Sequence, residues 1–140
     1  MAKRYLLDTN ICVFLLRGMY AVDKRLDQVG LRNCYISEIT VLELKYGVEL
    51  SKQKDGIDRS SQLNNFLSAI SVIPITDALD ICAREKIRLR LAGTPADDDF
   101  DLLIGCTAVA GNMVLITENV KHFKNIQDIK LENWIDRATT

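Results

Sequence analysis

Hydrophobic and polar positions follow two patterns along this chain. Short apolar runs bounded by polar or turn-forming residues predict buried strands. Longer segments, in which apolar residues recur every three or four positions, predict helices that pack on one face. We expect strands at residues 3–7, 33–36, 72–75, 113–117 and 130–131. We expect helices at residues 10–16, 22–29, 39–50, 57–70, 77–91 and 100–110.

Glycine and proline mark where several of these elements end. Gly30 follows the helix at 22–29, and Gly111 follows the helix at 100–110, as is typical of helix C-termini. Pro74 places the third strand near its end or at a sheet edge, because proline cannot donate to the strand ladder. Strands that alternate with helices predict an α/β fold with a mainly parallel sheet of four to five strands between helices.

The composition fits one domain spanning residues 1–140. With 48% hydrophobic residues, the chain is long enough for one well-buried core. The formal net charge of −1 excludes a strongly basic protein, so any polyanion would have to be held by a local positive patch or a bound metal. No signal peptide or membrane-spanning run is visible, which predicts a cytoplasmic protein that does not insert into a membrane.

The four cysteines, which form no Cys-x-x-Cys pair, lie among apolar neighbours. We interpret them as small buried hydrophobic residues in a reducing compartment. The single histidine, His122, argues against a zinc site and against a hydrolase of the Ser-His-Asp or Cys-His kind.

Acidic residues recur at the ends of the predicted buried elements. Asp8 follows the first strand directly, and Glu43 lies among apolar residues of the helix at 39–50. A third acidic group, at 97–101, opens an apolar helix. Because ligand sites in open parallel sheets gather at the carboxyl ends of strands, these positions predict a carboxylate site for a hard divalent cation.

Helix capping is the competing explanation for the first two acids. An aspartate after a strand often caps the next helix, so capping and function are equally good interpretations of Asp8 taken alone. Thr40 and Glu43 fit the capping-box pattern, in which the glutamate reaches back to a backbone amide. If the helix begins earlier, at Ser37, Glu43 lies inside it and its carboxylate needs another partner.

The acidic run contains Asp97, Asp98, Asp99 and Asp101. One or two carboxylates at a helix N-terminus are explained by the positive end of the helix dipole. Asp101, directly before a buried apolar segment, is not explained in this way. Carboxylates brought together raise one another's pKa unless a cation such as Mg²⁺ or Mn²⁺ neutralises them.

The segment after the fourth strand would bring Thr117, Glu118 and Asn119 to the same edge of the sheet. A strand-to-helix turn capped by Asn119 explains this segment slightly better than direct metal ligation. We expect the Thr117 hydroxyl to donate a hydrogen bond to a metal-binding carboxylate and so to fix its orientation.

A basic segment precedes the acidic run, and Trp134 lies near the end of the chain. Such a helix is usually a solvated face, and contact with phosphate groups is the alternative. The tryptophan is expected to close the core rather than to stack on a base. The basic residues are Arg84, Lys86, Arg88 and Arg90.

Taken together, these segments resemble the PIN-domain family, and within it the VapC toxins of toxin–antitoxin pairs. The resemblance is spread over nearly the whole chain, and its specificity comes from the combination. The matching segments are residues 6–11, 37–47, 100–105, 115–119, 122–123 and 131–134.

The resemblance implies a three-layer α/β/α fold and a Mg²⁺- or Mn²⁺-dependent endoribonuclease. Asp8, Glu43 and Asp101 match the three core acids of the family, as catalytic residues and metal ligands. Many members carry a fourth acid where this chain has Asn119, so that a second metal is an open question. Asp99 is the first candidate to compensate as a ligand, with Asp98 and Glu118 as alternatives. The supporting residues are Thr9, Asn10, Thr117 and Asn119.

The resemblance also implies an RNA substrate of the tRNA class, a cognate antitoxin and a homodimer. The apolar helix at 10–16 offers mild support for the dimer, because it has more apolar surface than one core contact needs. A catalytically silent binding module that acts through its antitoxin is the alternative function. A phosphatase of the haloacid-dehalogenase kind is disfavoured, since it would need an aspartate where Asn10 stands.

Overall fold

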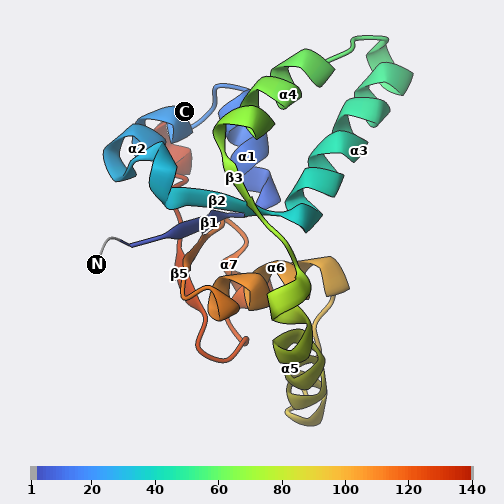
Figure 1. The fold of residues 1–140 in the computed structure, drawn as a ribbon, viewed down its shortest axis with the longest axis vertical. Helices are drawn as coiled ribbons and strands as arrows, with labels where there is room; N and C mark the ends of the chain where they lie inside the picture. The colour runs from blue at the N-terminus through green and yellow to red at the C-terminus, as the bar shows by residue number, and fades with distance from the viewer. Residues whose placement is uncertain (1–2, 140) are drawn as a thin grey trace.

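Five parallel strands form the centre of the molecule in the computed structural model, which describes residues 3–139 (Figure 1). Their order in the sheet is β3-β2-β1-β4-β5, and every neighbouring pair is parallel. The strands are β1 (Tyr5–Leu7), β2 (Cys34–Ser37), β3 (Ser71–Ile73), β4 (Val114–Ile116) and β5 (Lys130–Glu132). The predicted mainly parallel sheet is therefore confirmed.

Helices cover both faces of this sheet. In Figure 1, α1 to α4 lie on one side of the strands and α5 to α7 on the other. The first group is α1 (Thr9–Leu16), α2 (Val22–Val29), α3 (Glu38–Asp55) and α4 (Ser60–Ala69). The second is α5 (Leu79–Leu91), α6 (Asp99–Ala110) and α7 (Val120–Phe123). Short 3₁₀ turns occupy Leu31–Asn33, Thr76–Ala78 and Arg137–Thr139. This is the three-layer α/β/α arrangement expected from the sequence.

The sheet divides the apolar interior into two clusters, which corrects the expectation of a single core. Successive residues of a strand point to opposite faces. Leu7 accordingly packs with the cluster under α1 to α4, whereas Leu6 packs with the cluster under α5 to α7. Trp134 is 3% exposed and its ring centroid lies 5.7 Å from that of Tyr5, so it closes the core as predicted.

Side-chain caps set where the helices begin. Ser37 caps α3 by accepting a hydrogen bond from the Ile39 N–H, so the helix starts ahead of Thr40. The capping-box interpretation of Thr40 and Glu43 is therefore wrong. Asp98 caps α6 by accepting from the Phe100 N–H.

Several predicted bounds differ from the structure for local reasons. The helix expected at 57–70 begins only at Ser60, because Asp55 and Asp58 accept backbone hydrogen bonds that form turns before it. The helix expected at 39–50 continues to Asp55 and ends at Gly56, whose φ of 71° lies in the left-handed region. β3 is an edge strand followed by Pro74, as predicted.

No disulfide joins the cysteines. All four are free, and Cys12, Cys34 and Cys106 are buried. Within residues 3–139, no helix is both long and apolar enough to cross a membrane.

Candidate active site

The candidate site forms at the carboxyl ends of β1 and β4, which are neighbours in the sheet. Asp8 comes directly after β1, and Thr117 comes directly after β4. The Thr117 Oγ1–H donates to Asp8 Oδ2 at 2.8 Å, which is the predicted hydrogen bond between these two segments. Parallel strands bring their carboxyl ends to one edge, so residues far apart in sequence meet there.

Asp8 is the most buried acid of the site, with 5% of its surface exposed. Its Oδ1 accepts from the Thr9 N–H at 2.8 Å, so Asp8 also caps α1. Burial raises the pKa of the Asp8 carboxyl to about 6, against the opposing effect of the Thr117 hydrogen bond. The charges of Asp101 and Glu43 add to the rise. Capping and a functional role are therefore compatible at this residue.

Glu43 projects from α3 toward the start of α1. Its Oε1 accepts from the Thr9 Oγ1–H at 2.6 Å, and Thr9 Oγ1 lies 3.1 Å from Thr40 Oγ1. Burial raises the pKa of the Glu43 carboxyl, the Thr9 hydrogen bond opposes the rise, and the charges of Asp101 and Asp98 add to it. The partner that a half-buried glutamate requires is thus a threonine hydroxyl from another helix.

Asp101 lies in the first turn of α6, with its side chain 26% exposed. Its Oδ2 is 3.3 Å from His122 Nδ1 in α7. Burial raises the pKa of the Asp101 carboxyl and the His122 contact lowers it, whereas Asp98 raises it further. The contact with the His122 imidazole therefore offsets part of the rise in the pKa of Asp101.

Asp8, Glu43 and Asp101 form one electrostatic group. The charge of Asp101 raises the pKa of both other carboxyls, although each acid comes from a different element. Carboxylates held together in this way are stabilised by a cation, and oxygen donors suit Mg²⁺ or Mn²⁺. Among residues 3–139, no three Asp, Glu, His or Cys side chains are close enough to surround a metal ion. Mg²⁺ usually takes one or two protein carboxylates and several waters, so the donor set still fits it.

Asn10, two residues after Asp8, carries a buried side-chain oxygen, Oδ1, without a hydrogen-bond partner in the described part of the chain. A buried acceptor without a partner is costly, and a water or cation would satisfy it. Asn10 lies in the first turn of α1, directly after Asp8 and Thr9.

Asn119 lies at the N-cap position of α7 without a side-chain capping bond, which corrects the interpretation of this residue as a cap. Its backbone N–H donates instead to Thr117 Oγ1 at 2.9 Å. The turn after β4 is therefore held by the Thr117 hydroxyl, which also binds Asp8.

Two acids considered as substitute ligands have basic partners. Asp99 is exposed and lies 3.0 Å from Lys86 Nζ, on the side of α6 that meets α5. Glu118 makes two hydrogen bonds of 2.6 Å to the guanidinium of Arg137. The structure does not bring Asp99 into the acidic group, and it engages Glu118 in an ion pair.

The basic segment lies on α5 and does not form one continuous patch. Arg88 donates to both carboxylate oxygens of buried Glu85 and to the Asn125 carbonyl. Lys86 pairs with Asp99, and Arg84 and Arg90 are exposed. Arg88 thus joins α5 to the loop after α7.

Sequence reasoning missed two members of the site, namely Thr40 and His122, and considered Asp98 only as an alternative ligand. Thr40 is fully buried beside Thr9, which no periodicity reveals. Asp98 caps α6 and raises the pKa of Glu43 and Asp101. The position of His122, shortly after the Thr117 turn, was the one available signal for its contact with Asp101.

The raised pKa of Asp8 predicts how stability depends on pH. The folded protein binds this proton more tightly than the unfolded chain, in which the pKa has its ordinary value of 3.8. The free energy of unfolding should therefore rise as the pH falls through about 6, and the gain is complete only below 3.8. Between pH 7 and pH 5 the expected gain from Asp8 is about 1 kcal/mol in metal-free protein.

Urea unfolding in EDTA at pH 7 and pH 5 measures this gain. The Asp8→Asn variant should show a smaller pH dependence, because its side chain cannot titrate. Equal pH dependence in the two proteins would contradict the assignment of the raised pKa to Asp8.

The sequence of residues 5–129 matches the PIN domain family. Ribonuclease VapC2 of Rickettsia felis is 37% identical over 139 residues, covering 93% of this chain and 97% of the relative. The tRNA(fMet)-specific endonuclease VapC of Shigella flexneri is 29% identical over 133 residues, covering 94% and 98%.

A solved structure of VapBC2 from Rickettsia felis, bound to a DNA fragment from its promoter, contains a similar chain. The TM-score is 0.82 at 34% identity, covering 93% of this chain and 98% of that one. The similarity therefore extends over the whole sheet and both helical layers.

Proposed function

The chain belongs to the PIN domain family, and on that premise we propose that it is an endoribonuclease toxin dependent on Mg²⁺ or Mn²⁺. The observation that carries the proposal is how three acids meet beside the end of β1. Thr117 and the Thr9 amide bind Asp8, and the Thr9 hydroxyl binds Glu43. Asp101, in α6, lies near enough for its charge to raise the pKa of both carboxyls. The ribonuclease relatives, which this chain matches over nearly its full length, support the reaction class.

The residues of this chain hold the acids in a fixed arrangement. Thr117 and the Thr9 amide fix the two oxygens of Asp8, and the Thr9 hydroxyl fixes Glu43. Asp8 and Asp101 would hold the divalent cation, with Glu43 as a ligand or as the group that accepts a proton from the attacking water. When bound, the cation would activate water and neutralise charge on the scissile phosphate.

We propose RNA of the tRNA class as the substrate. The support is the similarity to a tRNA(fMet)-specific endonuclease over 94% of this chain. A toxin that cuts such RNA acts in the cytoplasm, which is where we place this protein.

We also propose a cognate antitoxin and a homodimer as partners. The structural relative is a VapBC complex, which supports an antitoxin. Within α1, Val13, Phe14, Leu15 and Leu16 are only half-buried, and on α3 Leu42 and Tyr46 are exposed by 53% and 66%. These apolar side chains are available to a protein partner beside the acidic site.

Thr117→Val should lower the rate of RNA cleavage by about 10- to 100-fold, because losing a group that orients a ligand has effects of this size. The hydroxyl also lowers the pKa of Asp8, so its loss should move the acid limb of the pH–rate profile to higher pH. Thr117→Ser keeps the hydroxyl and serves as the matched control. Equal losses in both variants, with no shift of the pH profile, would show that Thr117 acts only through packing.

Expression in a bacterial host, combined with a metal titration, tests the proposed function. Wild-type protein should stop growth and Asp8→Asn should not, and co-expression of the proposed cognate antitoxin should restore growth. Mn²⁺ titrated into purified protein and followed by electron paramagnetic resonance should bind to wild type and not to Asp8→Asn. Growth arrest by both proteins and no Mn²⁺ binding would favour the catalytically silent binding module.

A further inference from the structure

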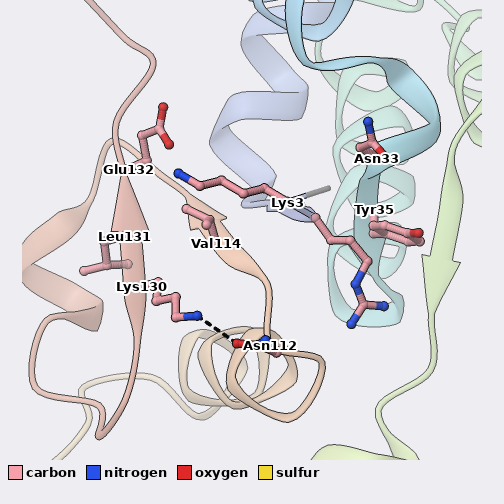
Figure 2. A pocket seen from close by; sticks show the side chains of 9 residues that line it. Lys3, Asn33, Tyr35, Asn112, Val114, Lys130, Leu131 and Glu132 are labelled. Atoms are coloured by element: carbon pink, nitrogen blue, oxygen red, sulfur yellow. Dashed lines mark hydrogen bonds between the residues drawn. The ribbon is translucent and has the colours of Figure 1, made fainter. Parts of the chain in front are cut away.

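A pocket lined by polar and apolar residues lies at the opposite end of the sheet from the acidic site. Lys3 and Arg4 precede β1, Asn112 precedes β4, and Lys130 begins β5, so the pocket is formed at the amino ends of the strands. Its volume is about 790 Å³. Lys3 crosses the middle of the view in Figure 2, between the residues contributed by β5 and Tyr35 of β2.

The pocket has an excess of positive charge. Among the described residues that line it, three are cationic, namely Lys3, Arg4 and Lys130, and the only acid is Glu132. One oxygen of that acid, Oε1, accepts from the Trp134 indole N–H at 3.1 Å. A local excess of this kind is notable in a chain whose formal net charge is −1.

Neutral groups hold two of these cations in place. The Lys130 ammonium donates to Asn112 Oδ1 at 2.8 Å. The Arg4 guanidinium donates to the Gly111 carbonyl and lies over the Tyr35 ring, 5.9 Å from its centroid. Within residues 3–139, no carboxylate pairs with any of the three cations of the pocket.

This arrangement differs from that of the other positioned cations of the protein. Arg88 and Arg137 are held by carboxylates that neutralise them. In the pocket, Lys130 and Arg4 are positioned by neutral groups, and no carboxylate within residues 3–139 forms an ion pair with them. Asn112 adds a donor, because its oxygen is bonded to Lys130 and its amide nitrogen has no hydrogen-bond partner in the described residues.

The geometry points to a binding site for the phosphate of a nucleotide, either free or within an RNA chain. Lysine ammonium groups bind phosphate as point charges, and an arginine and an amide nitrogen supply directed donors. A volume of about 790 Å³ is within the usual range for small-molecule sites. The site is separate from the acidic group and does not depend on cleavage.

An acidic protein segment is the competing occupant. Its carboxylates are single charges spaced along a chain, so they match a long groove better than one pocket. A phosphate concentrates its charge on one group with several acceptor oxygens, which suits an ammonium and an amide group held side by side, as at Lys130 and Asn112. The phosphate is therefore the better match to the observed arrangement.

Binding measurements on the double variant Lys3→Gln/Lys130→Gln test this inference. Adenosine monophosphate, inorganic phosphate, a short RNA and an acidic peptide are titrated in EDTA, so that RNA stays intact. Lys24→Gln/Lys54→Gln removes the same charge from exposed lysines outside the pocket and is the matched control. Thermal unfolding checks that each variant is folded.

We expect the pocket variant to weaken binding of the phosphate-bearing probes by about tenfold or more. In a plot of the logarithm of RNA affinity against the logarithm of salt concentration, the slope for the pocket variant should be shallower than that for wild type by about one to two units. If the pocket variant loses binding of adenosine monophosphate, the ligand is a free nucleotide. If it loses binding of RNA and adenosine monophosphate does not bind, the ligand is a phosphate within an RNA chain. Equal binding by the pocket variant and the control, or lysine-dependent binding of the acidic peptide alone, would overturn the inference.

These outcomes are distinct from those of the proposed function. A protein that cleaves no RNA but binds phosphate through Lys3 and Lys130 would fail as a nuclease and retain this site. If the wild type cleaves RNA and the pocket variant binds all probes as tightly as the wild type does, the nuclease function stands and this binding site is excluded.

Discussion

Replacing Asp8 by asparagine is expected to reduce RNA cleavage by about 10³-fold or more, because electrostatic stabilisation of the reacting groups is usually the largest single contribution. Asparagine has nearly the same shape, keeps one oxygen for the Thr9 hydrogen bond and places an amide beside the Thr117 hydroxyl. It lacks the charge that a divalent cation needs. The initial rate of cleavage of a labelled RNA in Mg²⁺ measures the effect.

The same substitution should leave the metal-free protein as stable as the wild type, or more stable, at pH 7. Asp8 is ionised there although burial opposes the charge, and Asp101 and Glu43 repel it. A neutral asparagine at this position would not carry this penalty. Asp27→Asn, on the exposed side of α2, controls for the loss of one negative charge. Marked unfolding of Asp8→Asn in urea would show that the carboxylate is structural.

Asp101 and Asp99 should respond very differently to the same change. Asp101→Asn is expected to lower cleavage by about 10³-fold, because Asp101 belongs to the acidic group. Asp99→Asn should change it by less than about fivefold, since Asp99 is exposed and pairs with Lys86. Both acids lie in the first turn of α6, so each variant is the other's control for helix effects.

Cleavage rates and Mn²⁺ affinities of the two variants, measured side by side, separate their roles. A large loss of both in Asp99→Asn would restore this residue as a metal ligand. Wild-type values in Asp101→Asn would remove Asp101 from the site.

Much of the architecture follows from local patterns in the sequence. The helix Val22–Val29 and its end at Gly30 match the prediction, because an amphipathic period and a glycine C-cap act over a few residues. The hydrogen bond from Thr117 to Asp8 could be predicted because both residues follow strands of one parallel sheet. The ends of the predicted strands therefore indicate where the centre of the site lies.

Other features depend on contacts that no local pattern encodes. Glu43 fits a capping box by spacing alone, and only the earlier cap at Ser37 places it inside α3, facing Thr9. The contact between His122 and Asp101 requires the packing of α7 on α6. The pairing of Asp99 with Lys86 likewise follows from how α5 meets α6.

The most direct test of the central claim is cleavage of a total tRNA pool by purified protein. Wild type in Mg²⁺ or Mn²⁺ should give discrete fragments, and neither wild type in EDTA nor Asp8→Asn in metal should give any. Fragments that persist in EDTA, or with Asp8→Asn, would contradict a metal-dependent site built on Asp8, Glu43 and Asp101.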